Sequence, residues 1–228
     1  MKLLTATRLL FWLLIATNTF AYAQIVEIHD PNLRQAIRQE LQLSDDASIT
    51  QQQMLKLIGL FAADRGIIDL TGLEYAINLD FLDLGGNQIR DIRPLENLIQ
   101  LTWLSLWQNQ VQDITPLTNL TKLKTLDLSY NYIIESLEPL KDLIQLEVLN
   151  FTNNQVKDIT PLANMTKLKY LELRYNQVGD LTPLANLVNL EELYIKDNLA
   201  NDITPLQGLN LIKSVSYTHL TLPTKRIV

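Results

Sequence analysis

The sequence predicts an α/β solenoid, in which short strands and helical turns alternate at a fixed period. Asparagine recurs at nearly constant spacing, with steps of 22, 22, 23, 22 and 22 residues. The recurring asparagines are Asn87, Asn109, Asn131, Asn154, Asn176 and Asn198. A proline phrase recurs with the same period. Self-similarity at a period of this length is typical of repeat architectures.

Residues 1–23 are predicted to be a secretory signal peptide. Lys2 and Arg8 are followed by a short apolar run, and an Ala-Tyr-Ala motif ends at Ala23. This order is typical of a signal that is cleaved, here before Gln24. Because a membrane span needs ~20 apolar residues, we expect no stable membrane anchor in this chain.

Residues 24–56 are predicted to form a helical N-terminal cap over the end of the repeat core. Asp30 and Pro31 provide an N-cap and a first helical residue. The apolar stripe of this helix consists of Leu33, Ile37 and Leu41. Thr50 and Gln53 predict a capping box at the start of a second helix.

Residues 57–214 are predicted to be the repeats. Leu104 and Leu106 alternate with polar or aromatic residues, which predicts a strand with one buried face. Each asparagine follows such a strand, where a buried amide can donate and accept hydrogen bonds at once. We therefore expect a stacked asparagine ladder. The first repeat is degenerate, with Arg65 in the asparagine position and Gly72 in the proline position.

The return half of each repeat is predicted to be a single helical turn. Its phrase reads Asp113-Ile-Thr-Pro116-Leu117, and proline suits the start of a helical turn. About eight residues separate the proline from the next strand, which favours a 3₁₀ turn. The threonine before the proline is expected to cap this turn. The one extra residue of the Asn131 repeat is expected near residues 133–135.

From Leu57 to Leu211 these phrases resemble the 22-residue leucine-rich repeats of the internalin type. The Asp-Pro-Asn-Leu helix resembles the helical cap of the same proteins. The resemblance implies a curved solenoid with a parallel concave sheet, a convex side of 3₁₀ turns and an N-terminal α-helical cap.

Residues 215–228 are predicted to be an irregular tail. Ile212 and Val215 are expected at core positions of a further strand, but Leu220 stands where the next asparagine is due. One hypothesis is that this tail is non-native. The natural protein would then continue past residue 214 with further repeats, a cap or an anchor.

Composition excludes several classes of function. The formal net charge is −6, and removal of Lys2 and Arg8 with the signal would make it −8, so nucleic acid is not expected as a partner. The chain has no cysteine, which excludes disulfides and zinc–thiolate sites. His29 and His219 belong to no triad or metal group, and the Asp83/Asp127 pair lacks other site residues. We expect no metal, no cofactor and no enzyme activity.

The strand residues that point away from the core are predicted to form a ligand-binding concave face with its aromatic rings in the open. The candidate residues are Phe81, Asp83, Trp103, Ser105, Trp107, Asp127, Tyr130, Asn150, Tyr170, Glu172, Arg174, Tyr175, Tyr194 and Lys196. Exposed Trp and Tyr are enriched at interaction hot spots. Aromatic residues also favour strands and stack on their neighbours, so binding and mere stacking both remain open.

The leading hypothesis is an exported, monomeric bacterial module that binds another protein, of a host or of the envelope, through this face. Its location would be the medium, the periplasm or the cell surface. A glycan- or cell-wall-binding module is the alternative, because Trp103, Trp107 and Tyr130 suit stacking on sugar rings. A structural fragment of a larger surface adhesin is the third.

Overall fold

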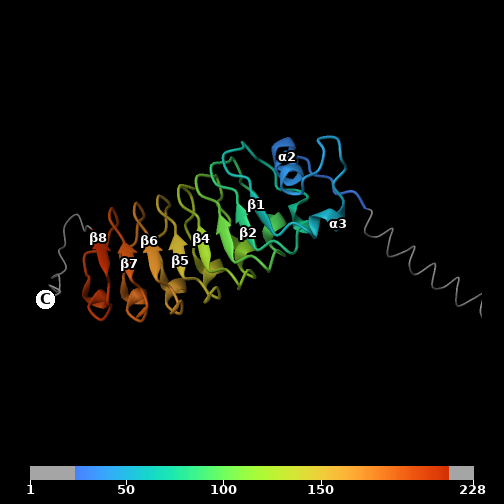
Figure 1. Cartoon of the computed structure of the whole chain (residues 1–228). Helices are drawn as coiled ribbons and strands as arrows, with labels where there is room; N and C mark the ends of the chain where they lie inside the picture. Colours follow the sequence, from blue (N-terminus) through green and yellow to red (C-terminus); the bar gives the residue numbers. More distant parts are fainter. Residues whose placement is uncertain (1–23, 216–228) are drawn as a thin grey trace, which may run out of the picture.

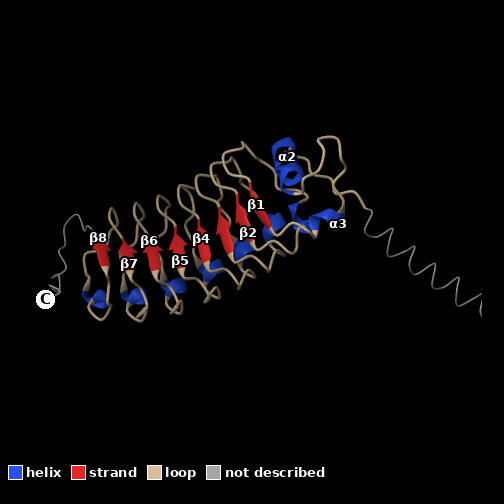
Figure 2. Cartoon of the chain, in the orientation of Figure 1, coloured by secondary structure: helices blue, strands red, loops and turns tan. Residues whose placement is uncertain are grey.

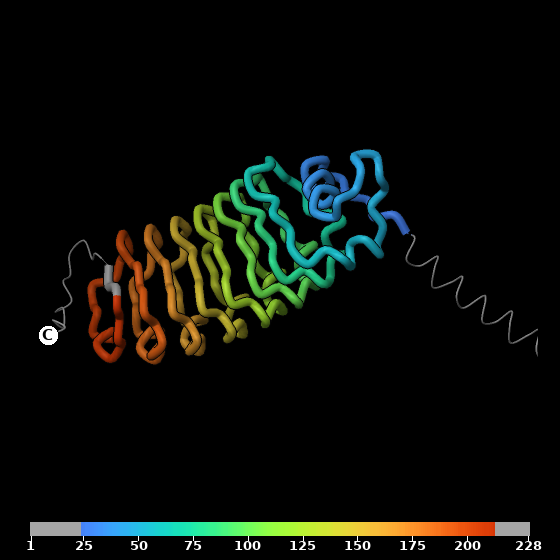
Figure 3. The backbone as a smooth tube through the Cα atoms, viewed as in Figure 1, coloured from blue at the N-terminus to red at the C-terminus, as the bar shows by residue number. Residues whose placement is uncertain are grey.

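Within residues 24–215, eight three-residue strands lie side by side in one parallel sheet, in the order of the sequence (Figure 1). They are β1 (Gly59–Phe61), β2 (Phe81–Asp83), β3 (Trp103–Ser105), β4 (Thr125–Asp127), β5 (Val148–Asn150), β6 (Tyr170–Glu172), β7 (Glu192–Tyr194) and β8 (Lys213–Val215). The computed structural model describes residues 24–215. The predicted signal peptide and residues 216–228 of the predicted tail lie outside the described residues. Successive turns of the backbone stack along the molecule (Figure 3).

In the described part of the chain, seven 3₁₀ turns form the side opposite the sheet (Figure 2). They span Leu73–Tyr75, Arg93–Leu95, Thr115–Leu117, Glu138–Leu140, Thr160–Leu162, Thr182–Leu184 and Thr204–Leu206. From the second turn onward, proline is the second residue of each. The predicted solenoid of parallel strands and 3₁₀ turns is therefore confirmed.

In the turns that begin with Thr-Pro, the side chain that accepts the first backbone hydrogen bond is the aspartate and not the predicted threonine. Asp113 Oδ1 accepts a hydrogen bond from Thr115 N at 2.9 Å. Equivalent contacts of 2.8 Å join Asp158, Asp180 and Asp202 to threonine N atoms two residues ahead. The first N–H of a helical turn needs an acceptor, and a carboxylate two residues earlier reaches it. Hydrogen bonds from Thr115 hold the pKa of Asp113 below its usual value.

Two helices cover the N-terminal end of the solenoid, as the sequence predicts. In α2 (Pro31–Glu40), Asp30 is the N-cap and its side chain accepts hydrogen bonds from two backbone N–H groups. In α3 (Gln51–Met54), Thr50 and Gln53 form the capping box. Within the described part of the chain, neither helix nor any other has the length and apolar character that crossing a bilayer requires.

Leucine fills a continuous core that runs from the cap to the last repeats. Leu82, Leu104 and Leu126 face one another on adjacent strands, and all three have no exposed surface. Alternation along each strand then sends the intervening side chains to solvent. The core uses one phenylalanine, Phe151, so the other rings of the sheet are left for its solvent side.

Asparagine side chains join successive turns into a ladder along one edge of the sheet. Asn109 Nδ2 lies 2.9 Å from Leu84 O in the previous repeat and 3.2 Å from Leu106 O in its own. Its Oδ1 accepts a hydrogen bond from Ile89 N at 3.0 Å. The other asparagines of the ladder repeat this pattern. Each amide therefore satisfies backbone groups that would otherwise be buried without partners.

Two repeats differ in length, and both differences are absorbed outside the sheet. The extra residue after Asn131 lies at Tyr132, whose φ of 70° is left-handed. The core resumes at Ile134, whose N lies 3.4 Å from Asn154 Oδ1, against 2.9–3.0 Å for the equivalent contacts of Ile89, Val111, Val156 and Val178. The strand register across the insertion is unchanged, since Leu126 still pairs with its neighbour's leucine.

The last described repeat is one residue shorter than predicted. Ser214 pairs with Leu193, where Val215 is expected, and Ile212 is 73% exposed and not in the core. The missing residue lies between Leu209 and Leu211, both of which pack against the core. The shorter turn moves every later residue of the repeat by one position, so Ile212 leaves the core.

Candidate functional site

The solvent side of the sheet, here called the concave face, carries the predicted site residues in ordered rows. One row holds Phe81, Trp103, Thr125, Val148 and Tyr170. The next row holds Phe61, Asp83, Ser105, Asp127, Asn150, Glu172 and Tyr194. Because neighbouring strands lie ~4.8 Å apart, each side chain contacts its neighbours in the row.

Three rings stack at the N-terminal end of this face. Phe81 lies between Phe61, with ring centroids 4.5 Å apart, and Trp103, with centroids 4.2 Å apart and planes 13° from parallel. Stacking leaves Phe81 and Trp103 half-buried, so the expectation of fully open rings is wrong for them. Phe61 is not among the predicted site residues, because its repeat has Arg65 in place of the asparagine that marks the register. The 22-residue period does place Phe61 in the same row as Asp83. Phe61 is 62% exposed.

Trp107, two residues after β3, leans toward the segment that follows β2, where Gly85 makes room. A methyl group on Gly85 would lie 1.8 Å from Trp107 Nε1. The ring therefore packs on the glycine backbone and is half-buried. Packing of this kind holds the ring in place on one side and leaves its other side exposed to solvent.

Ser105 and Glu172 are buried, which corrects their assignment to the open face. Ser105 is 2% exposed, because its short side chain lies between longer neighbours in its row. Glu172 is 1% exposed. Its Oε1 accepts hydrogen bonds from Arg174 N at 3.2 Å and Arg174 Nε at 2.8 Å, so the carboxylate folds down against the strand. Neither side chain is available for contact with a partner.

Asp127 is half-buried at the centre of the face, where its carboxylate accepts three hydrogen bonds. Its Oδ1 accepts hydrogen bonds from Ser129 N at 2.8 Å and Ser129 Oγ at 2.6 Å, and its Oδ2 lies 3.3 Å from Asn150 Nδ2. Loss of water around the carboxyl raises the pKa of Asp127, and the negative charge of Asp83 raises it further. The hydrogen bonds oppose this rise without cancelling it.

The C-terminal half of the face holds rings and charges that bind one another. Arg174 lies 5.5 Å from the ring centroid of Tyr194, and the rings of Tyr170 and Tyr194 are 5.4 Å apart. Burial and the charge of Glu172 raise the pKa of Tyr170 to about 12, so its hydroxyl stays protonated. Lys196 lies 3.9 Å from Asp197. These contacts occupy most of the polar groups in this half.

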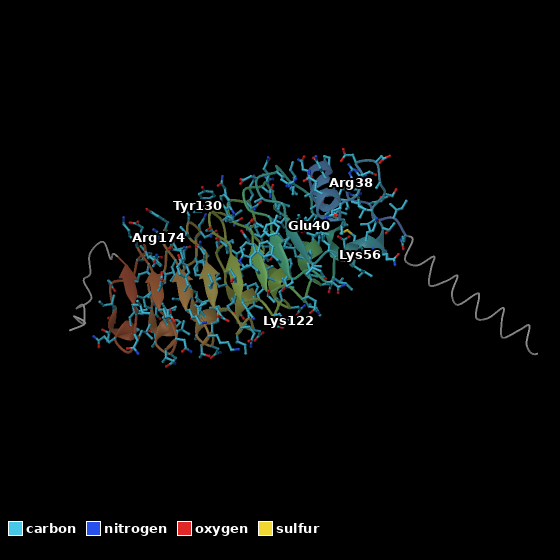
Figure 4. The ribbon with its side chains drawn as sticks, in the orientation of Figure 1. Arg38, Glu40, Lys56, Lys122, Tyr130 and Arg174 are labelled. Carbon is cyan, nitrogen blue, oxygen red and sulfur yellow. The ribbon has the colours of Figure 1, made fainter. Side chains whose placement is uncertain are left out.

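Tyrosines also line the rim where the strands turn into the asparagine edge. Tyr130 and Tyr175 have left-handed φ values of 56° and are 40% and 47% exposed. Tyr130 and Arg174 both lie along one edge of the molecule, opposite Lys122 (Figure 4). The residue at this position is left-handed in every repeat, as at Gln108 with a φ of 50° and Asp197 with a φ of 58°, so the conformation belongs to the repeat turn. The inserted Tyr132 is 53% exposed and meets Tyr130 edge to face, with centroids 6.3 Å apart.

A groove of about 810 Å³ lies beside this insertion on the asparagine edge. Gln108, Gln110, Gln112, Arg90 and Tyr132 contribute to its walls. In the sequence, this groove is marked only by the 23-residue step between Asn131 and Asn154, which by itself does not predict a groove. Its amide-rich lining provides hydrogen-bond donors and acceptors for a neutral polar ligand.

Catalytic and metal-binding arrangements are absent from the part of the chain that the structure describes. His29 lies 3.6 Å from Asp69 of the first repeat and 3.9 Å from Glu27 of the cap, and all three side chains are exposed. The strand of Ser105 separates Asp83 from Asp127. Among residues 24–215, no three His, Cys, Asp or Glu side chains converge to hold a metal ion.

Known proteins share this repeat and this fold. A family model described as leucine-rich repeats in two copies matches residues 99–142, 121–164, 144–186 and 166–211. The structure of internalin C2 from Listeria monocytogenes is 34% identical, with a TM-score of 0.66 over 81% of this chain and 92% of that one.

Two further solved structures are similar. A second internalin from Listeria monocytogenes, inlF, is 32% identical, with a TM-score of 0.57 over 79% of this chain and 67% of that one. A leucine-rich repeat protein from Leptospira interrogans is 26% identical, with a TM-score of 0.58 over 64% and 40%. No curated protein sequence matches the chain.

Proposed function

Because the chain belongs to the internalin-type leucine-rich repeat proteins, we propose that it is an exported module that binds another protein through its concave face. The family is non-enzymatic, so the prediction that the chain is not an enzyme is confirmed by this membership. The partner is a protein of a host or of the bacterial envelope, and the module acts as a monomer after export.

The observation that carries the proposal is the position of the rings. Leucine fills the core, yet Phe61, Phe81, Trp103 and Trp107 gather on the solvent side of three adjacent strands. Rings held by stacking lose little freedom when a partner binds, which reduces the entropic cost of association. Large aromatic side chains of this kind supply much of the binding energy of protein interfaces.

The test compares capture of partners by the full chain and by two double variants. Trp103→Ala/Trp107→Ala removes the rings from the face. Ile99→Ala/Ile144→Ala is the control, because both isoleucines are 48% exposed and lie outside the strands. Proteins captured from envelope extracts and host-cell lysates are identified by mass spectrometry, and their affinity is then measured with purified partner.

We expect the tryptophan variant to lose capture at least tenfold and the isoleucine variant to keep it, with both folded by circular dichroism. Retention of every partner by the tryptophan variant would contradict the proposal.

A glycan is the second candidate, favoured by the amide-lined groove next to Tyr132. A glycan array probed with the same chains separates the two functions. Glycan binding that survives Trp103→Ala/Trp107→Ala but is lost in Tyr132→Ala would assign the groove to sugar recognition. If neither proteins nor glycans bind, the third candidate is a structural segment of a larger adhesin, which sequencing beyond the 3′ end would test.

A further inference from the structure

The N-terminal half of the concave face has negative charge without positive charge. Asp83 and Asp127 lie two strands apart in the same row, and no lysine or arginine stands on β1–β4. Neither carboxylate forms an ion pair with any residue of the described chain. The third carboxylate of the row, Glu172, is neutralised by Arg174 at 2.8 Å.

The environment of Asp127 makes its charge unfavourable in the free protein. One oxygen, Oδ1, is held by Ser129, while Oδ2 has only the 3.3 Å contact with Asn150. A carboxylate that is partly removed from water and lacks a counter-charge raises the free energy of the folded state. A cation brought by a partner would remove that cost.

The ring of Trp103 offers a second contact for the same cation. One face of the indole stacks on Phe81 of β2. Its other face is therefore turned toward β4, where Trp103 pairs with the short side chain of Thr125 and Asp127 lies two residues further along. A guanidinium or ammonium group over a tryptophan face is attracted by the ring electrons, more strongly where water is excluded.

A hydroxyl without a partner among the described residues lies two residues after the neighbouring strand, β5. Thr152 is 3% exposed, and its Oγ1 accepts and donates no hydrogen bond among the described residues. Tyr130 N donates to Thr152 O at 2.8 Å, which places the threonine beside the turn that follows Asp127 and contains Ser129. Buried polar groups are normally paired, and an exception asks for an explanation.

We propose that the partner contributes a lysine or arginine side chain that lies over β4, with its charge against Asp127 and its stem or guanidinium plane against Trp103. This inference rests on the proposed function and specifies the partner as a protein with a basic contact segment. The net charge of −6 also attracts a basic partner at long range, which speeds its association.

The first experiment uses small probes in place of the partner. The ¹⁵N-labelled full chain is titrated with N-acetyl-arginine methylamide and with its neutral isostere N-acetyl-citrulline methylamide, while the indole N–H signals of Trp103 and Trp107 are followed. We expect the arginine probe to bind at least fivefold more tightly than the citrulline probe. In Asp127→Asn the preference should fall below twofold.

The control variant is Asp113→Asn, which changes the same charge on the exposed edge and should keep the preference. Equal binding of the two probes by the unchanged chain, or an unchanged preference in Asp127→Asn, would overturn the proposal. Absence of any shift up to the solubility limit of the arginine probe would also overturn it.

The second experiment separates this inference from the proposed function. Capture of partners is measured for Asp127→Asn beside Trp103→Ala/Trp107→Ala. We expect both to lose capture at least tenfold. Loss with the tryptophan variant alone would leave the protein-binding function standing and refute the cation. Loss with neither would refute both.

Discussion

The two halves of the concave face share one backbone register but satisfy their polar groups differently. In the C-terminal half, Arg174 binds Glu172 and covers Tyr194, so charge and ring meet within the protein. In the N-terminal half, rings stack on rings, and Asp83 and Asp127 have no cation within the described chain. The charges of the C-terminal half are therefore paired within the protein, whereas the carboxylates of the N-terminal half lack a counter-charge. An unpaired charge of this kind is expected on the half that binds a partner.

The largest expected effect comes from removing one ladder asparagine in each half, which tests whether the two halves differ only in their surface residues. Asn109→Ala and Asn176→Ala each remove a buried amide, 4% and 7% exposed, that bonds two repeats. The backbone groups that these amides bind would lose their hydrogen-bond partner and are too deeply buried to bind water instead. Each variant should therefore lose about 2–4 kcal/mol of free energy of unfolding, measured by urea denaturation. The losses should be similar. A difference above about 1 kcal/mol would mean that the scaffolds of the two halves also differ.

The next effect concerns the packing of Trp107. Gly85→Ala places a methyl group into the indole and should cost about 1–3 kcal/mol, because the ring has to leave its position. Gly179→Ala is the matched control in the C-terminal half, where a methyl group meets nothing within 4 Å. It should change stability by less than about 0.5 kcal/mol. Thermal unfolding followed by tryptophan fluorescence measures both, and an unshifted emission maximum in Gly85→Ala would refute the described packing.

The smallest effect has opposite signs in the two halves. The folded state raises the pKa of Asp127, so it binds the proton more tightly than the unfolded state does. Stability from this group is present below its ordinary pKa of 3.8 and is lost as the pH rises through the raised value. Asp127→Asn should therefore stabilise the protein at pH 7, by less than about 1 kcal/mol.

The advantage of Asp127→Asn should vanish near pH 3.5, where the native carboxyl is protonated. Glu172→Gln in the other half should instead destabilise the protein at pH 7, because it removes the charge paired with Arg174. Melting temperatures at the two pH values test both signs. If Asp127→Asn destabilised the protein at pH 7, the charge of Asp127 would be stabilised within the protein, and the contrast between the two halves would be wrong.

Period-based reasoning located most of the scaffold because the same hydrogen bonds recur in every turn. Leu104 had to be buried once alternation made it part of a strand, and Asn109 had to turn inward because a buried turn needs a donor and an acceptor. The helical cap was predictable for a related reason. Asp30 and Thr50 each precede an apolar helical pattern, and their side chains accept hydrogen bonds from the first N–H groups of a helix.

The direction of each side chain on the concave face could not be predicted in the same way. Trp107 leans toward the segment that follows β2 because Gly85, 22 residues earlier, leaves room there. Glu172 disappears from the surface because Arg174 folds over it. Such choices depend on the shapes of neighbours in adjacent repeats, and the repeat pattern itself carries no information about them.

The extra residue at Tyr132 has a consequence for how proteins of this architecture diversify. The strand pairing on either side is unchanged, so the extra residue leaves the rows of the concave face in register. The asparagine edge thus tolerates insertions that the sheet would reject, since a one-residue slip in a strand would exchange core and solvent side chains. New loops grafted after the asparagines should consequently leave the neighbouring recognition surface intact, which makes this edge the place where such a chain can acquire another specificity.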